Sequence, residues 1–469
     1  MNLPCRHGLM KSTSYFGEPM QNLGMRCCTL LLYVLAGLLN TLAAAQITAI
    51  THARLIDGSG SPATDDRTIL IEGRTIKAVG GPDLKPPSGA RVIDAKGKTA
   101  MPGLSDMHVH LTGGWDGETT DLLGYQNYMN SLLYSGVTTV LDTGNVPPFV
   151  LQLRLAIASG VVQGPRLYCV GPILDGADPV WGPIAVAVSS KYQVPSVVEQ
   201  LKTDDVDLIK LYVGLSDRLV RAISAEAKKK QLRTIIDQWN RNGSMDLMDD
   251  GIAGFAHLPG HRISQDAIRH AKETGIFFIS TLAVHEVFTG RRLADLHFLD
   301  DPLIADVTPP SHLKGLREFA QKPRSPELQG KIKQALLDFQ GAEENVKPLW
   351  DSGVLIATGT DAPYPGDFQG EGVHHELELL VESGLTPLQA ITASTKNAAT
   401  IMGADKEWGT LEAGKLANIL LIDGKPDQNI SDTRRITFVM KQGDVIDREK
   451  LKFGPVSRDF PISSSVSTE

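Results

Sequence analysis

The chain has 469 residues, of which 42% are hydrophobic and 21% charged, and its formal net charge is −8. This length is too great for one small core and fits a large barrel with a smaller module, and the composition is that of an ordinary globular protein. The negative charge excludes the basic footprint of a protein that binds nucleic acid or an anionic membrane surface.

Residues 1–45 have the order of a secretory signal peptide. Arg26 precedes the apolar run TLLLYVLAGLL, and small residues follow at 43–45. The run is shorter than the roughly 20 residues that a membrane-spanning helix needs. We therefore expect a secreted or periplasmic protein with no membrane attachment after cleavage, the alternative being an uncleaved anchor. Cleavage leaves Cys169 as the only cysteine, so no internal disulfide is expected.

Short β segments bracket the rest of the chain. Between 46 and 100, β-like runs alternate with turns at Gly58, Gly60 and residues 72–74. Near the other end, ANILLID and RRITFVMKQGDVI again indicate short strands. The Ser-rich residues 456–469 are expected to be disordered.

The middle of the chain alternates short apolar runs with helical patterns. Eight runs are typical of buried strands: LSDMHVH, GVTTVLDTG, RLYCVGPIL, VDLIKLYVG, RTIIDQW, GIAGFAHLPG, GIFFISTLAV and GVLIATGTDA. Helical patterns lie between and after them, including DRLVRAISAEAKKKQL, SQDAIRHAKETG and HHELELLVESGLTPLQAITASTKNAATIMG. This alternation predicts an α/β protein built on a (β/α)8 TIM barrel.

Polar side chains stand at the ends of several predicted strands. His108 and His110 alternate, so on a strand both imidazoles face the same side. Lys210, His257 and Asp361 lie in or just after the fourth, sixth and eighth runs. Taken singly, a histidine is more often a core group, a strand lysine usually reaches solvent, and an aspartate after a strand usually caps a helix. Because chemistry in such barrels sits at the C-terminal strand ends, the set predicts one converging site.

With these residues in place, the chain resembles the amidohydrolase superfamily, in its imidazolonepropionase-like and Xaa-Pro-dipeptidase-like branch. The matching stretches run in family order: LIDGSGSP, VIDAKGKTAMPGLSDMHVHL, SGVTTVLDTG, GPRLYCVG, DLIKLYVG, FAHLPG, ATGTDAP, HELELLVESGLTPLQAITASTKNAATIMG and GTLEAGKLANILLID. The resemblance implies a hydrolase barrel over 101–408. It also implies a small β-sandwich formed from 46–100 together with 409–455.

The resemblance also implies the role of each residue. His108 and His110 match the pair that binds a first metal ion, and His257 matches a ligand of a second. Lys210 matches a lysine that reacts with carbon dioxide to give a carbamate bridging two ions, a reaction that requires the uncharged amine. Asp361 matches the aspartate that binds the first ion and moves the proton from water to the leaving amine. One or two divalent ions are expected, zinc first, with manganese, cobalt or iron as alternatives.

The fifth strand departs from the family pattern. Where the family has a histidine, RTIIDQW places Asp237. Asp237 either ligates the second ion, as carboxylates do, or leaves the second site weak or absent. In a third alternative the site is degenerate and the protein is not a hydrolase.

Other side chains follow the predicted strands and are expected near the substrate: Tyr212, His285 and Tyr364. His285 fits packing behind the site equally well. Trp181 is either a substrate wall or a loop anchor. His374 and His375 open a helical pattern, and we expect them to form a solvated surface pair.

The sequence therefore predicts a metal-dependent hydrolase acting on a C–N bond of a small molecule, such as the amide of a prolyl dipeptide or a cyclic amide. Hydrolysis of an ester or lactone is the alternative within enzymes, because the same water attacks those carbonyls. A metal-binding or ligand-binding protein without catalysis is the alternative outside them. Relatives of this kind often assemble, so a homo-oligomer is a further expectation.

Overall fold

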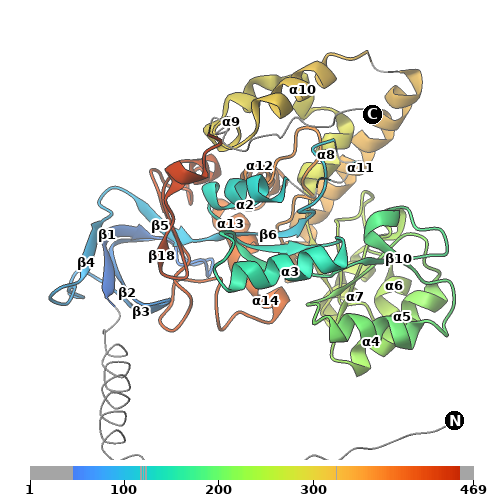
Figure 1. Ribbon diagram of the computed structural model, residues 1–469, viewed down its shortest axis with the longest axis horizontal. Helices are drawn as coiled ribbons and strands as arrows, with labels where there is room; N and C mark the ends of the chain where they lie inside the picture. Colours follow the sequence, from blue (N-terminus) through green and yellow to red (C-terminus); the bar gives the residue numbers. More distant parts are fainter. Residues whose placement is uncertain (1–45, 117–118, 120, 122–123, 324, 455–469) are drawn as a thin grey trace, which may run out of the picture. The chain divides into compact units, whose positions relative to one another are not determined.

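The computed structural model describes residues 46–116, 119, 121, 124–323 and 325–454 (Figure 1). The predicted signal peptide and the predicted disordered tail at 456–469 lie outside the described residues. Within the described part of the chain, no helix is long and apolar enough to cross a bilayer.

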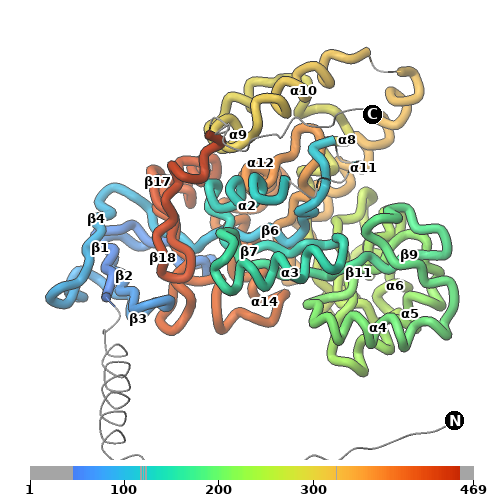
Figure 2. Tube along the Cα trace, in the orientation of Figure 1, coloured from blue at the N-terminus to red at the C-terminus, as the bar shows by residue number. Residues whose placement is uncertain are grey.

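Strands from both ends of the described chain form one sheet. Its order is β18-β17-β16-β5-β1-β2-β3, with β4 paired to β1. The members are β1 (Ile47–Leu55), β2 (Thr64–Glu72), β3 (Thr75–Gly80), β4 (Arg91–Asp94), β5 (Thr99–Pro102), β16 (Ile419–Ile422), β17 (Ile436–Lys441) and β18 (Asp444–Val445). Figure 2 shows the blue and red ends of the tube side by side. The antiparallel pairing of β16 with β5 supports a small domain made from both chain ends.

Parallel strands form the centre of the molecule. They are β6 (Leu104–Val109), β7 (Val137–Asp142), β8 (Arg166–Cys169), β9 (Ile173–Asp175), β10 (Ala185–Ala187), β11 (Ile209–Leu211), β12 (Thr234–Ile236), β13 (Gly254–Phe255), β14 (Phe277–Ile279) and β15 (Leu355–Ala357). Each of the eight apolar runs contains one of these strands, except that the third is divided into β8 and β9. The α/β class is thereby confirmed.

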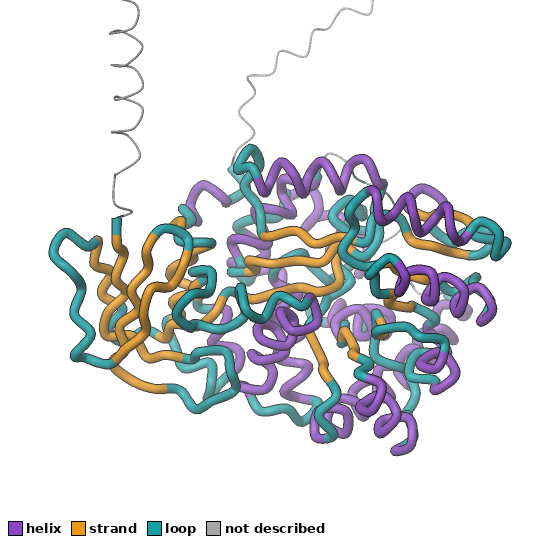
Figure 3. The backbone as a smooth tube through the Cα atoms, turned by 90° about the horizontal axis from the view of Figure 1, so that it is seen from below, coloured by secondary structure: helices purple, strands orange, loops and turns teal. Residues whose placement is uncertain are grey.

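The parallel strands are linked in a closed circuit. One sheet has the order β6-β7-β8 and the other β10-β9-β11-β12-β13-β14-β15. The Asp207 amide donates to the Cys169 carbonyl beside β8, and the Met107 amide of β6 donates to the Thr358 carbonyl after β15. These bonds link β8 to the segment before β11 and β6 to the segment after β15, and they support the predicted (β/α)8 barrel. Figure 3 shows helices around these strands.

The helices of the described residues are α2 (Tyr125–Tyr134), α3 (Pro147–Ala158), α4 (Val194–Thr203), α5 (Asp217–Lys229), α6 (Met245–Asp249), α7 (Gln265–Thr274), α8 (Leu282–Thr289), α9 (Pro302–Ala305), α10 (Pro310–Ala320), α11 (Pro326–Asp351), α12 (Glu371–Glu382), α13 (Pro387–Thr392) and α14 (Ala398–Met402). The predicted helices in 217–232 and 264–275 are confirmed as α5 and α7. Ser264 caps α7 by accepting from an amide, and Gly275 ends it in the left-handed conformation.

Two segments differ from the expected pattern. The long helical pattern from His374 to Gly403 is broken between α12 and α13, because Gly384 has φ +101° and Pro387 begins a new helix. A π-helical turn, Ala393–Asn397, separates α13 from α14. After β14 the chain makes a long helical excursion, α8 to α11, before it returns to β15. In this excursion α11 packs against α8 (Figure 1).

An apolar layer lies on the N-terminal side of the candidate site residues. Met107, Leu141, Ile235, Ile279 and Ala357 come from five different strands and pack in one buried cluster. Three of them, Met107, Ile235 and Ala357, precede site residues on their strands. Burial of each large side chain contributes roughly 1.5–3 kcal/mol to the stability of the fold. Close packing of this cluster holds the strands that carry the site residues in fixed positions.

Candidate metal centre and active site

The residues predicted at the strand ends converge in one buried region. His108 lies in β6, Lys210 in β11, Asp237 directly after β12, His257 two residues after β13 and Asp361 four residues after β15. All five are at most 7% exposed. The parallel register brings the carboxyl ends of these strands to the same side, which is why His108 and Asp361, 253 positions apart in the sequence, meet.

His108, His110 and Asp361 form a compact donor set. The Nε2 atoms of His108 and His110 each lie 3.1 Å from Asp361 Oδ1. The Nδ1 of His108 lies 2.8 Å from the Ala256 carbonyl, and that of His110 lies 2.9 Å from the Gly144 carbonyl. A carbonyl only accepts, so each Nδ1 donates and each Nε2 lone pair faces the centre. One donor atom from each of the three side chains lies within 4.8 Å of the others, which suits one metal ion.

The backbone after β15 is shaped to deliver Asp361. A Cβ at Gly359 would lie 2.8 Å from the Cβ of His108 and 2.5 Å from Ile279, so only glycine permits this approach. Asp361 itself has φ +69°, a left-handed conformation that costs a non-glycine residue stability. Its amide donates to the His108 carbonyl at 2.8 Å, which holds the strained residue in place.

Lys210, Asp237 and His257 form a second group beside the first. Asp237 Oδ2 lies 3.5 Å from Lys210 Nζ and 3.1 Å from His257 Nε2. Lys210 Nζ also lies 3.1 Å from His108 Nε2, so the lysine stands between the two groups. His257 Nδ1 lies 2.7 Å from Thr281 Oγ1, which leaves Nε2 turned toward Asp237.

The electrostatics of the site favour the metal-binding protonation states of His108, Asp237 and Asp361, whereas the pKa of His110 is raised because Asp361 outweighs burial. Burial, together with the charge of Lys210, lowers the pKa of His108 to about 3. Burial raises the pKa of Asp237, but His257 and Lys210 outweigh it and bring the value to about 2. For Asp361 burial is likewise outweighed, chiefly by His108, and the pKa lies well below its usual range. His108 is thus a neutral imidazole, and Asp237 and Asp361 are ionised, near neutral pH.

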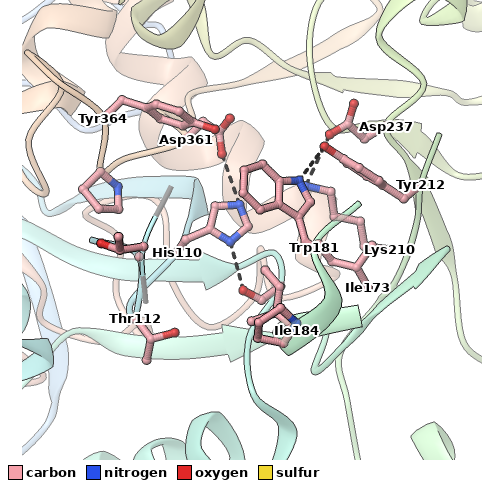
Figure 4. Close-up of a pocket in the computed structure, with 15 residues that line it drawn as sticks. His110, Thr112, Ile173, Trp181, Ile184, Lys210, Tyr212, Asp237, Asp361 and Tyr364 are labelled. Carbon is pink, nitrogen blue, oxygen red and sulfur yellow. Dashed lines mark hydrogen bonds and ion pairs between the residues drawn. The ribbon is translucent and has the colours of Figure 1, made fainter. Parts of the chain in front are cut away.

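A pocket opens onto this centre (Figure 4). It is lined by the site residues His110, Lys210, Asp237 and Asp361 and by Thr112, Gly113, Thr119, Gly144, Ile173, Trp181, Pro183, Ile184, Tyr212, Pro363 and Tyr364. Trp181 is both wall and anchor, because its indole donates to Tyr212 Oη at 2.9 Å while the ring lines the pocket. Tyr212 and Tyr364, both expected near the substrate, therefore face the same space.

His285 packs behind the site and does not face the pocket, which is the second of the two positions expected for it. It is not among the lining residues of this pocket, and its ring stacks on Trp239 with centroids 4.8 Å apart. Trp239 in turn meets the edge of His257, also at 4.8 Å. The sequence analysis did not identify Trp239. Its position two residues after Asp237, at the end of a strand, would have placed it near the site.

The predicted surface pair is wrong for His374. Its side chain is fully buried and contacts Thr433 Oγ1 and the Ser135 carbonyl, both at 2.9 Å. His375 is mostly buried and its Nε2 lies 2.5 Å from Glu286 Oε2. The reason is that α12 packs against neighbours on nearly all sides, so its polar residues bond within the protein.

These features define an α/β enzyme whose strand ends carry a largely buried group of side chains, His108, His110 and Asp361, that could hold a metal ion. Comparison with known proteins gives the family. The model of the amidohydrolase family matches residues 99–446. The chain belongs to the amidohydrolase family and is an amidohydrolase, an enzyme class that acts on carbon–nitrogen bonds. The family resemblance predicted from the sequence is confirmed.

Individual relatives are distant. The chain is 23% identical to an ochratoxinase of Aspergillus niger over 457 residues, covering 85% of this chain and 86% of that protein. It is 25% identical to an imidazolonepropionase of Shouchella clausii over 424 residues, covering 81% and 85%. A solved Xaa-Pro dipeptidase with bound methionine superposes with a TM-score of 0.70 at 22% identity, over 86% of this chain and all of that one. This last likeness supports the fold.

Proposed function

We propose that the protein is a metal-dependent hydrolase that uses water to cleave an amide-type C–N bond of a small molecule. The observation that carries the proposal is the convergence of His108 Nε2, His110 Nε2 and Asp361 Oδ1 within 4.8 Å at the base of a pocket. Both imidazoles are held by backbone carbonyls in the tautomer that ligates. This donor set fits one divalent ion, with zinc expected first for two nitrogens and one carboxylate oxygen.

Asp361, Tyr212 and Tyr364 have separate roles in the proposed hydrolysis. A divalent ion in this position acidifies a bound water and polarises the scissile carbonyl. Asp361 takes the proton of the attacking water and delivers it to the leaving nitrogen. Burial raises the pKa of Tyr212 and of Tyr364, so both phenols stay protonated and donate hydrogen bonds to the substrate.

The chemical state of Lys210 determines whether the site binds a second metal ion in addition to the first. If its uncharged amine attacks carbon dioxide, a C–N bond forms, one proton is released and an anionic carbamate results. The position of Nζ between His108 and Asp237 supports this, because a carbamate there reaches both groups. Asp237 and His257 then supply the remaining ligands. If Lys210 stays an ammonium group, it pairs with Asp237 and one ion is bound.

The substrate class follows from the relatives by analogy. A prolyl dipeptide corresponds to the Xaa-Pro dipeptidase, and a cyclic amide to the imidazolonepropionase. We also propose that residues 1–45 direct export of the protein. Hydrolysis of an ester or lactone, and ligand binding without catalysis, are the outcomes that would replace amide hydrolysis.

The test combines metal content with turnover. Elemental mass spectrometry of the purified protein should give one or two divalent ions per chain, and a panel of dipeptides, cyclic amides and lactones should show turnover that a chelator abolishes. Asp361→Asn should lose activity at least a thousandfold, since asparagine tolerates the left-handed backbone but cannot carry the proton. Asp266→Asn, at an exposed site on α7, is the matched control.

The outcomes separate the alternatives. Turnover of lactones alone would replace the amide assignment. A chain that takes up no metal, or shows no turnover with metal restored, would refute the hydrolase proposal.

A further inference from the structure

A second cavity borders the active-site pocket. Pro363 and Tyr364 line both spaces, so the Tyr364 segment is the partition between them. The far side of the second cavity is formed by the aromatic rings of Trp115, Tyr128 and Phe368, with Val307 and Leu316 among the aliphatic residues. A molecule reaching past Tyr364 from the reacting centre would enter a largely apolar space.

Two residues that line this cavity carry buried acceptor oxygens without a hydrogen-bond donor. Both carboxyl oxygens of Asp367 are buried and have no hydrogen-bond partner among the described residues, and the residue is 1% exposed. Gln369 Oε1 is in the same condition. Its Nε2 donates to the Ala362 carbonyl at 2.7 Å, which fixes the amide orientation with Oε1 as the free end. Asp367 and Gln369 both line the cavity.

No cation of the described chain satisfies Asp367. Arg292, whose charge acts on this carboxyl, donates instead to the Gly366 carbonyl and to Glu371. Burial raises the pKa of Asp367 well above its usual range. A buried acceptor without a donor lowers stability, and such groups persist where a ligand or function uses them.

We propose that this cavity is a subsite for the part of the substrate remote from the scissile bond, and that it takes a primary ammonium group on an aromatic or apolar stem. The ammonium donates to Asp367 and Gln369, and the stem packs against Trp115, Tyr128 and Phe368. An anionic group is not expected to bind, because it offers the unpaired oxygens of Asp367 and Gln369 no hydrogen-bond donor. This inference rests on the proposed function and narrows the substrates to amides that carry an amine beyond the scissile bond.

Binding of phenethylamine alone tests the subsite without any turnover. Isothermal titration of the metal-loaded full chain at pH 7.5 compares phenethylamine with phenylacetate, which has the same ring and the opposite charge. Binding by wild type that Asp367→Asn weakens about tenfold to a hundredfold is expected. Asp266→Asn is the exposed control and should bind as wild type does.

Two further variants keep the result interpretable. Thermal unfolding of Asp367→Asn should occur near the wild-type temperature, because asparagine has the same size and replaces one unpaired buried polar group with another. Asn127→Asp adds a carboxylate to the lining of the cavity and should tighten phenethylamine binding several-fold. Asp361→Asn should still bind phenethylamine, which separates this subsite from the metal centre.

The proposal is overturned if wild type does not bind phenethylamine, if Asp367→Asn binds it equally well, or if phenylacetate binds as tightly. Loss of binding in Asp361→Asn would place the amine at the metal centre and also overturn it. If only the hydrolase proposal is wrong, the protein should show no turnover but should still bind phenethylamine.

Discussion

Replacing Asp237 with asparagine removes the carboxylate that faces the buried ammonium group of Lys210. The two groups lie 3.5 Å apart, and Lys210 is 2% exposed. His257 Nε2, at 3.1 Å, is the other partner of Asp237. Asparagine keeps the size of the side chain but leaves the lysine charge without a counter-charge in the metal-free protein.

The expected loss can be estimated in two ways. The pKa of Asp237 falls from 3.8 to about 2 despite burial, which corresponds to about 2 kcal/mol in favour of the ionised form. Removing one partner of a buried ion pair costs about 3–5 kcal/mol. We expect about 3 kcal/mol. With an unfolding entropy of about 2.1 cal/mol/K per residue over about 400 folded residues, this lowers Tm by about 3–4 °C.

Thermal unfolding of the chelator-treated protein measures this shift. The double variant with Lys210→Met should recover most of the loss, because it removes the unpaired charge. Asp266→Asn, with an exposed carboxylate, should change Tm by less than about 1 °C. If Asp237→Asn leaves Tm unchanged, or if Lys210→Met does not offset its effect, then the ion pair does not stabilise the folded site and the reasoning fails.

Two further predictions concern pH. If Asp237 adds negative charge around the attacking water, Asp237→His should shift the pH optimum of hydrolysis downward; a pH–rate profile with an unshifted or raised optimum would contradict this. Arg292 and Arg434 outweigh burial and lower the pKa of Glu371 from 4.5 to about 2, so its stabilisation of about 3 kcal/mol is complete above pH 4.5 and is lost as pH falls toward 2. The Tm difference between wild type and Glu371→Gln should therefore shrink over that interval, and a constant difference would count against the depressed pKa.

The strands could be predicted because they are buried on both faces. Parallel strands of this kind appear as continuous apolar runs, and even the two-residue β13 was recognisable from the run around it. The helical excursion between β14 and β15 was not recognised. The first half of α11, from Pro326 to Asp338, is mostly exposed, so no strong apolar face marks it in the sequence.

The candidate site divides in the same way. His108, His110 and Asp361 could be placed together because the position of a residue at a strand end determines where it lies in the fold. His374 could not be read correctly, since its burial depends on Ser135 and Thr433, which come from distant parts of the sequence. The unpaired oxygens of Asp367 are a property of the packed cavity, and no local pattern signals them.

If the protein is the metal-dependent hydrolase that we propose, the state of Lys210 sets the number of metal ions that the site holds. With Asp237 and Asp361 ionised, one divalent ion beside an ammonium at Lys210 gives a net charge of +1. Two divalent ions beside a carbamate at Lys210 give the same net charge. The net charge of the site is therefore the same in both states. Conversion of the first into the second consumes carbon dioxide and a second ion and releases two protons from the Lys210 ammonium group. Addition of bicarbonate should therefore raise the metal content of a one-ion protein to two, and Lys210→Met should remain at one. A second ion taken up equally without bicarbonate would show that Asp237 and His257 bind it without the carbamate.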